Sequence, residues 1–478
     1  MPGVSTNFID KQFAAAEAMW QRNEIERAEV LLRELCAHEP AREDVAMLLA
    51  KVQQSRGCLG AAAETLLAVC RANSFEPALS IRCARFAQQC DRHAIASQIC
   101  AGALAAGAVE PELLVLAGNV ARETGDFDTA RARYLAALDA GVDLGRHHVL
   151  GALANTRRFV DPADTEIARF ARHFADAGYS ARSRASAGFA LAKAQNDLAD
   201  YAAAASTLRE ANAMIHAVSP WSPAAWQRFV AARTREPVTD ATGASGVAFV
   251  PVFIIGLPRT GTTLTATLLS RTAGTRDRGE LRALRFIADR LVGGGHLGNR
   301  TALAEAATLY RTLAIQDDVP ATWYLDQDPL NYRYLHIAAA MFPQAKVIHL
   351  RRDRRDTALS LWSQDFAHPD LAFAYDFDDM KAYMTCHDAL MRHWKQTLRI
   401  PVHELDYETL VAEPGATLAA LRTFIGAPEA DGGPSKNVTP VQSASVWQAR
   451  QPVYTTSVGR WRHYAPHVPE LQGFDGAG

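Results

Sequence analysis

A glycine-rich loop lies between an apolar run and an amphipathic segment. Val252 to Ile255 predicts a short buried parallel strand, Gly256 to Gly261 a loop, and Thr262 to Ser270 a helix. Such a unit points backbone N–H groups and a helix N-terminus at an anion, usually a phosphate. The glycine spacing is that of a Walker A loop, but Thr262 replaces its lysine, and the only cation of this loop is Arg259.

A second unit of the same kind follows. Lys346 to Leu350 predicts another buried strand, Arg352 follows its C-terminal end, and Ser360 lies eight residues later on a predicted helix. Ligands of open parallel sheets bind at the carboxyl ends of the strands. The arginines at 351, 352, 354 and 355 therefore predict a local basic cluster at the same edge as the glycine-rich loop. A solvated charged loop is the alternative interpretation.

Together these two units resemble the cofactor motifs of sulfotransferases that use 3'-phosphoadenosine 5'-phosphosulfate. The resemblance implies that the second motif, similar to R-D-P-x-D-x-x-x-S, binds the 3'-phosphate through Arg352 and Ser360, with Arg354 replacing the family's proline. No metal is expected, because the transferred sulfuryl group carries less charge than a phosphoryl group and the Walker lysine is missing. The first motif is similar to the family's PRSGTT loop, which implies that the 5'-phosphosulfate is bound by Pro258, Arg259, Thr260, Gly261, Thr262 and Thr263.

Further matches extend the resemblance over residues 248–465. The C-terminal part resembles the segment that closes over the cofactor in tyrosylprotein sulfotransferases and their bacterial repeat-bearing relatives, and its matching residues include Ser445, Arg460 and Trp461. The resemblance implies that Arg460 and Trp461 contact the cofactor and that Ser445 is a stabilising donor. A protein or peptide tyrosine is one acceptor that the resemblance allows, although the sequence does not identify the acceptor.

Two more residues are implied in catalysis. Glu280, in a Gly-Glu pair like that of the family, is the candidate general base that takes the acceptor proton. Gln327 stands where the family often has a lysine that stabilises the transition state. Arg259 and the backbone N–H groups after it are expected to stabilise charge on the bridging oxygen. Either Arg460 substitutes for the missing lysine, or the alignment slips by one, or the enzyme is weakened.

An internal repeat occupies the first half of the chain. Turn-forming residues recur every 34 residues at Asn23, Gly57, Asp91 and Gly125. The pattern predicts helical hairpins that stack because no single hairpin buries its apolar face. It resembles the tetratricopeptide repeat over residues 8–216, including a further copy at Tyr201, and implies either a surface for an acceptor or protein partner, or plain scaffolding. The register also fixes alanines at Ala28, Ala62, Ala96 and Ala130, and small residues at Ala16, Ala50, Ala84 and Gly118.

The expected fold therefore combines an all-α part with an α/β part. Residues 8–216 form a helical solenoid, residues 217–247 a linker rich in proline, glycine and serine, and residues 248–468 a P-loop-like parallel-sheet sulfotransferase domain. The 478 residues suffice for two to four domains.

Composition excludes several classes of protein. Lys+Arg is 50 and Asp+Glu is 52, so a globally basic nucleic-acid binder is excluded, and no apolar run is long enough to span a membrane. We expect neither nucleic-acid nor membrane partners. The seven cysteines include no CxxC pair and are interpreted as small buried hydrophobes of a cytoplasmic protein.

Two rival hypotheses remain. A P-loop kinase or NTPase would require a lysine at position 262 and a Mg²⁺-binding carboxylate, and neither is evident. A catalytically inactive sulfotransferase relative acting as a repeat scaffold is weakly favoured by Gln327 and Arg354.

Overall fold

The computed structural model describes residues 6–236, 249–366, 368–428 and 456–475. The chain divides into two compact units, Met1–Val142 with Thr312–Val319, and Asp143–Arg311 with Pro320–Gly478. This division lies before the linker expected at residues 217–247, because the helices between residues 149 and 233 group with the sheet.

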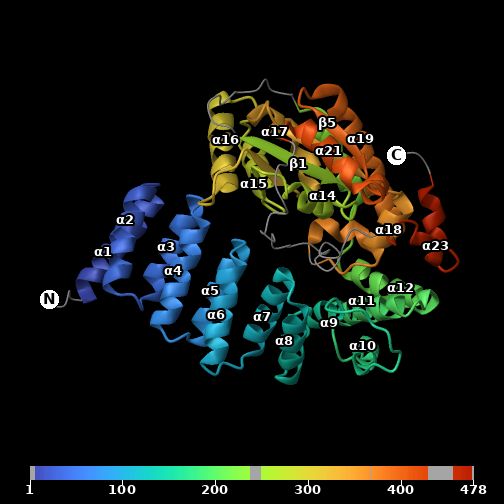
Figure 1. The fold of residues 1–478 in the computed structure, drawn as a ribbon, viewed down its shortest axis with the longest axis horizontal. Helices are drawn as coiled ribbons and strands as arrows, with labels where there is room; N and C mark the ends of the chain where they lie inside the picture. Colours follow the sequence, from blue (N-terminus) through green and yellow to red (C-terminus); the bar gives the residue numbers. More distant parts are fainter. Residues whose placement is uncertain (1–5, 237–248, 367, 429–455, 476–478) are drawn as a thin grey trace. The chain divides into compact units, whose positions relative to one another are not determined.

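The first unit consists of helices that pack in successive pairs, as Figure 1 shows. Alanine-rich faces and helix-favouring residues explain the helices, and turns of a few residues connect them. The pairs are α1 (Thr6–Gln21) with α2 (Ile25–His38), α3 (Glu43–Ser55) with α4 (Leu59–Ala72), α5 (Pro77–Gln89) with α6 (His93–Ala105), and α7 (Pro111–Thr124) with α8 (Phe127–Asp139).

The predicted 34-residue register is visible in the backbone. Asn23, Gly57, Asp91 and Gly125 all have positive φ, at 62°, 73°, 58° and 89°. The left-handed region is open to glycine and, more than to other residues, to Asn and Asp, so the residue types explain the turns. The turn before the further copy, at Ala199, has φ 61°. The alanines of the register are fully buried, as are the small residues before the turns that are alanine: Ala28, Ala62, Ala96, Ala130, Ala16, Ala50 and Ala84.

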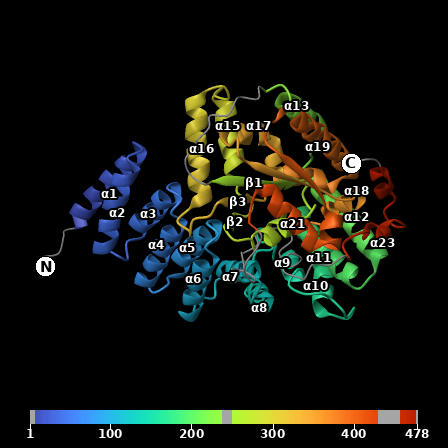
Figure 2. The ribbon, with the colours of Figure 1, turned by 45° about the horizontal axis from the view of Figure 1, so that its top comes forward.

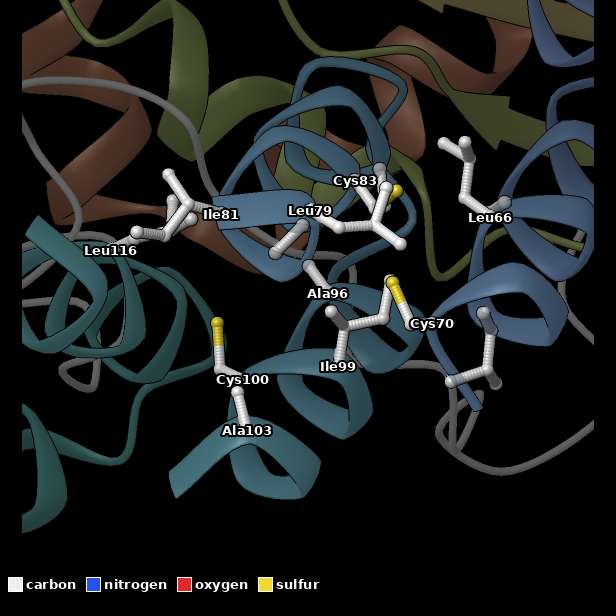
Figure 3. Packing of buried hydrophobic residues seen from close by; sticks show 14 of the residues in the cluster. Leu66, Cys70, Leu79, Ile81, Cys83, Ala96, Ile99, Cys100, Ala103 and Leu116 are labelled. Carbon is white, nitrogen blue, oxygen red and sulfur yellow. The ribbon is translucent and has the colours of Figure 1, made fainter. Parts of the chain in front are cut away.

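Buried side chains from α4 to α7 meet in one cluster of the first unit. Figure 3 shows Leu66 and Cys70 of α4 facing Leu79 and Cys83 of α5, with α6 alongside. Burial raises the pKa of the Cys100 thiol to about 12, which makes this thiol unreactive. The cysteines of the described chain are free, and those in this cluster serve as small apolar residues.

A short segment of the second half belongs to the first unit. Helix α16 (Arg300–Ile315) ends within it, and the Asp317 carboxylate accepts hydrogen bonds of 2.9 Å from the N–H groups of Gly60 and Ala61 at the start of α4. Arg92 donates to Asp317 at 3.3 Å. A Cβ added at Gly57 would lie 2.5 Å from the Thr312 carbonyl oxygen, so this close approach requires glycine.

The second unit begins with helices that pack on its later part. Asn212 donates a 2.9 Å hydrogen bond to the Trp362 carbonyl, and Arg209 pairs with Glu470 at 2.6 Å. These contacts commit the hairpin α11–α12 to the sheet-containing part of the chain. The helices are α9 (Val149–Ala154), α10 (Thr165–Ala175), α11 (Ala181–Asp197), α12 (Tyr201–Val218) and α13 (Pro223–Arg233).

A parallel sheet of strand order β2-β3-β1-β4-β5 forms the centre of the second unit (Figure 2). The predicted strands are confirmed as β1 (Val250–Gly256) and β4 (Lys346–Arg351), and their neighbours are β2 (Thr275–Asp277), β3 (Trp323–Asp326) and β5 (Val402–Asp406). Apart from the first residues of β1, β3 and β5, the apolar side chains of these strands are almost fully buried, because helices cover both faces. Helices α14 (Thr262–Leu269) and α21 (Pro414–Ile425) contribute to one apolar layer.

The remaining elements connect the strands. These elements are α15 (Ala283–Gly293), η1 (Pro329–Tyr334), α17 (Leu335–Met341), α18 (Arg354–Trp362), η2 (Pro369–Tyr375), α19 (Phe377–Thr397), α20 (Tyr407–Ala412), α23 (Trp461–Tyr464) and η3 (Pro469–Phe474).

No helix of the described residues is long and apolar enough to cross a membrane.

Candidate active site

The loop between β1 and α14 is tightly folded. A Cβ added at Gly256 would lie 2.6 Å from the Leu350 carbonyl oxygen, and one added at Gly261, where φ is 107°, would lie 2.6 Å from the Tyr407 ring. The Thr260 hydroxyl donates to the Leu257 carbonyl at 2.7 Å and closes the loop. The first N–H groups of an α-helix lack intrahelical partners, so the start of α14 at Thr262 is suited to an anion.

Side chains of the two predicted motifs meet at this loop. The Arg259 Nε donates a 3.1 Å hydrogen bond to the Ser360 Oγ, and an Arg352 nitrogen donates to the Arg259 carbonyl at 2.9 Å. Arg259 has φ 75°, a strained value for a non-glycine residue. The structure therefore brings Arg259, Arg352 and Ser360 together, while Pro258, Thr260, Thr262 and Thr263 are buried around them.

Arg352 differs from the other arginines of the predicted basic cluster. Its guanidinium lies over the Tyr407 ring at 4.6 Å and also donates to the Ser457 carbonyl at 2.7 Å. Within the described chain no carboxylate pairs with it, whereas Arg351 pairs with Asp406 at 3.0 Å. Arg354 and Arg355 are likewise paired, with Asp388 and Asp353. The expected basic cluster thus reduces to Arg352, because ion pairs neutralise its neighbours.

A cavity of about 570 Å³ adjoins Arg352 on the side of α19 and β5. Carboxylates and cations line it in similar numbers. Two buried imidazoles, His349 and His387, also line it, and burial lowers the pKa of both. The cavity offers a partly polar space beside the guanidinium and the loop.

The buried Asp356 of the second motif was not predicted as a functional residue. Its carboxylate accepts hydrogen bonds from the N–H groups of Gly459 at 2.6 Å and Trp461 at 2.9 Å. It thereby fixes the start of α23 beside Arg352. This aspartate is one of the motif residues, but nothing in the sequence indicates that it binds backbone N–H groups more than a hundred residues later.

The C-terminal residues implied in cofactor binding have other neighbours in the structure. Arg460 donates to the Asn196 side chain of α11 at 2.9 Å, and Tyr464 donates to the same oxygen. The Trp461 ring lies under the Arg355 guanidinium at 4.0 Å. Ser445 lies outside the described residues.

The two acceptor-side residues follow neighbouring strands. Glu280 follows β2 and Gln327 follows β3, and the Gln327 N–H donates to the Gly279 carbonyl at 2.9 Å. Gln327 is only 4% exposed, and its Oε1 has no hydrogen-bond partner among the described residues. A buried polar atom of this kind costs free energy unless a ligand or water satisfies it.

Glu280 is a carboxyl with strongly altered acidity. The residue keeps an exposed surface, but the surrounding protein desolvates the carboxyl and, with the nearby Asp328 carboxylate, raises its pKa to about 8. Arg282 and Arg259 act in the opposite direction. A carboxyl poised near neutral pH suits general acid–base chemistry.

The two arginines near Glu280 have different environments. Arg285 pairs with Asp370, which also pairs with Arg333 at 3.0 Å. Arg282 is exposed at the start of α15.

Within the described ranges no group of three or more His, Cys, Asp or Glu residues could hold a metal ion.

Comparison with known proteins finds a family match in the second half of the chain. Residues 251–431 match the family described as the sulfotransferase family, so the chain carries a domain of that family. An uncharacterized protein of Aquifex aeolicus (strain VF5) is 31% identical over 312 residues, which cover 60% of this chain and 41% of that protein. The chain thus spans about two fifths of the length of this relative.

Solved sulfotransferase structures also match, at low similarity. The sulfotransferase domain of the Synechococcus PCC 7002 olefin synthase has a TM-score of 0.34 and 19% identity, with 49% of this chain and 98% of that chain covered. A sulfotransferase from Alicyclobacillus acidocaldarius has a TM-score of 0.29 and 15% identity, covering 48% and 96%. TM-scores this low carry no weight for the function of the chain.

Proposed function

We propose that the chain is a sulfotransferase that uses 3'-phosphoadenosine 5'-phosphosulfate to sulfate an acceptor hydroxyl. The convergence of Arg259, Ser360 and Arg352 at the carboxyl ends of β1 and β4 carries this proposal. It joins both motifs of a sulfotransferase-family domain in one place, with an arginine that no described carboxylate neutralises. The donor supplies an activated sulfuryl group joined to phosphate.

Each residue of the cluster has a task in this proposal. Arg352 and Ser360 bind the 3'-phosphate, and the loop from Pro258 to Thr263 binds the 5' side through N–H groups at the start of α14. The Arg352 guanidinium, with which no described carboxylate pairs, and the adjoining cavity suit a phosphorylated nucleotide. Arg460 and Trp461 are proposed to contact the cofactor as well, and the bond from the Trp461 N–H to Asp356, next to the second motif, supports this for Trp461.

Glu280 takes the proton of the acceptor hydroxyl in this proposal. Its raised pKa makes it a stronger base than an ordinary carboxylate, and its exposed surface admits an acceptor. The Gln327 amide donates to oxygens that gain charge during transfer, with Ser445 as a second donor. The neutral Gln327 also supports the alternative that the domain is an inactive scaffold.

The N-terminal helices are proposed to be tetratricopeptide-like repeats that bind an acceptor or partner protein. The shared turn conformation at 34-residue spacing supports this assignment. Helices α11 and α12 contact the sheet-containing part, which leaves α1–α8 for such binding. A peptide or protein tyrosine is the first acceptor to examine, in a protein that we propose to be cytoplasmic.

Transfer of labelled sulfate from the donor tests the proposal. We expect incorporation into at least one of a panel of tyrosine peptides, glycans, phenols and lipids. The inactive scaffold should incorporate none and should not bind adenosine 3',5'-bisphosphate tightly. A P-loop kinase would instead transfer phosphate from a nucleoside triphosphate.

A further inference from the structure

Residues 457–464 are bound by parts of the second unit that are distant in the sequence. We call these residues the 457–464 segment. It includes α23, which Figures 1 and 2 both show beside α12 and α18. The backbone of the segment bonds to the second motif, and its side chains bond to the hairpin α11–α12. The segment therefore connects this hairpin to the edge of the sheet where the two motifs meet.

Asp356 of α18 holds the backbone of the 457–464 segment. This residue is 2% exposed, and its two oxygens accept from different N–H groups, one from Gly459 at 2.6 Å and the other from Trp461 at 2.9 Å. Gly459 has φ 72°, a value that favours glycine at this turn. Because each buried group would cost free energy without its partner, the two bonds fix the turn against α18.

Asn196, near the end of α11, holds the side chains of the same segment. Its oxygen accepts from the Arg460 guanidinium and from the Tyr464 hydroxyl, both at 2.9 Å. Tyr201, at the start of α12, stacks on His463 with ring centroids 4.8 Å apart and meets Tyr464 edge-on at 5.3 Å. Residues on both sides of the turn between α11 and α12 thus contact the segment.

The 457–464 segment in turn directs the Arg352 guanidinium. One Arg352 nitrogen donates to the Ser457 carbonyl at 2.7 Å, and another donates to the Arg259 carbonyl at 2.9 Å. The Ser457 hydroxyl lies 2.7 Å from the Tyr407 hydroxyl, and the Tyr407 ring lies against the same guanidinium at 4.6 Å. All three partners of the guanidinium are uncharged groups, so they fix its direction without neutralising it.

We propose that Asp356 and Asn196 are positioning residues of the donor site. They hold the 457–464 segment, whose Ser457 carbonyl directs the Arg352 guanidinium toward the 3'-phosphate. This inference rests on the proposed function. Each of the two residues acts through the segment, and neither is proposed to touch the donor. The hairpin α11–α12 thereby acquires a task in donor binding, separate from any binding of partners by α1–α8.

Holding the segment before the donor arrives favours binding. A segment that becomes ordered only on binding loses its conformational entropy at that moment, which lowers the affinity. With Asp356 and Asn196 in place, the donor meets a guanidinium whose direction is already fixed. Loss of either residue should therefore weaken donor binding although the charge of Arg352 is unchanged.

Hydrogen exchange and calorimetry on the full-length chain test the role of Asp356. Asp356→Asn keeps the shape of the side chain but replaces one acceptor oxygen with an amide donor, so one N–H group of the segment loses its partner. We expect faster exchange at the Gly459 and Trp461 amides, and roughly 10-fold weaker binding of adenosine 3',5'-bisphosphate.

A matched set of variants on α11 tests the role of Asn196. Asn196→Leu removes the acceptor for Arg460 and Tyr464 and should also weaken binding of adenosine 3',5'-bisphosphate, whereas Asn196→Asp keeps an acceptor oxygen and should restore it. Gln195 accepts a 2.9 Å hydrogen bond from the Thr207 hydroxyl within the same hairpin. Gln195→Leu removes this bond and should change neither the exchange of the segment nor the affinity.

Circular dichroism shows which variants are folded, and Asp356→Asn alone decides if Asn196→Leu does not fold. Faster exchange together with weaker binding supports the inference. Unchanged exchange at both amides overturns the hold of Asp356 on the segment. Faster exchange with unchanged affinity overturns the positioning role and leaves the proposed function standing. If the unmodified chain does not bind adenosine 3',5'-bisphosphate, the sulfotransferase proposal fails and the donor role of both residues fails with it, whereas faster exchange would still show that Asp356 holds the segment.

Discussion

Arg259 and Ser360 come from motifs separated by about a hundred residues, yet the arginine Nε lies 3.1 Å from the serine Oγ. This hydrogen bond links the loop after β1 to the helix after β4. Since these strands are neighbours in the sheet, their carboxyl ends bring both motifs to one edge. A ligand that binds one motif therefore lies within reach of the other.

Arg352 should carry much of the donor affinity. Replacing it with alanine removes a cation that no described carboxylate neutralises, so binding of adenosine 3',5'-bisphosphate should weaken roughly 10- to 100-fold. Calorimetry measures this change. Arg351→Ala is the matched control, because Arg351 already pairs with Asp406. If the Arg352 variant binds adenosine 3',5'-bisphosphate as tightly as the unmodified chain, Arg352 does not bind the phosphate.

Glu280→Gln should lower turnover by about 10²- to 10⁴-fold, because it keeps the shape and removes the proton acceptor. Donor affinity should barely change. In the unmodified enzyme the rate should rise with pH until about 8, where the carboxyl is half ionised. Steady-state kinetics between pH 6 and pH 9 tests both points. If turnover survives the substitution, the base lies elsewhere.

The same carboxyl should make stability depend on pH. Between its ordinary pKa of 4.5 and about 8, the folded protein keeps a proton that the unfolded chain has released. The free energy of unfolding therefore falls as the pH rises through this window. Relative to the unmodified chain, Glu280→Gln should become more stable at pH 8 than at pH 5. Urea denaturation at the two pH values measures the difference, and no difference contradicts the raised pKa.

Gln327→Lys should raise turnover at neutral pH. The structure commits Arg460 to Asn196, so no cation from that residue is expected beside the transferred group. A lysine would add a charge-assisted donor and would also favour the ionised form of Glu280. Initial rates at saturating donor measure the effect. A flat or lower rate would mean that another cation already serves the site.

Asp317 should stabilise the start of α4. Replacing it with alanine removes the acceptor for the Gly60 and Ala61 N–H groups and should cost about 1 kcal/mol. Hydrogen exchange at these two amides should accelerate. Glu64→Gln, on the exposed face of the same helix, is the control. Unchanged exchange in the Asp317 variant would show that the carboxylate does not cap this helix.

Local patterns in the sequence predicted more of the structure than charge did. The 34-residue register fixed the left-handed turns at Asn23 and Gly57, since turn conformation depends on the residue itself. The strand predicted at 252–255 is shorter than the observed β1, which spans Val250–Gly256. Pro251 lies inside the observed strand, and a proline gives no clear sign of where a strand begins. Sequence order along the chain placed Arg259 and Arg352 correctly at one sheet edge.

Local sequence patterns could not predict contacts between residues that are distant in the chain. The ion pairs that neutralise Arg351 and Arg354 depend on carboxylates from β5 and α19. The role of Asp356 depends on a segment about a hundred residues later.

The hydrogen bonds from Gly459 and Trp461 to Asp356 also set an order of events during protein synthesis. The ribosome makes Arg259 and Ser360 well before residues 457–461, and at about 5–20 residues per second the interval after Ser360 is roughly 5 to 20 seconds. During that interval a nascent chain can form β1 and β4 but has no partner for the Asp356 carboxylate. The sheet edge that carries Arg259 and Ser360 is therefore completed only after residues 457–461 have been made.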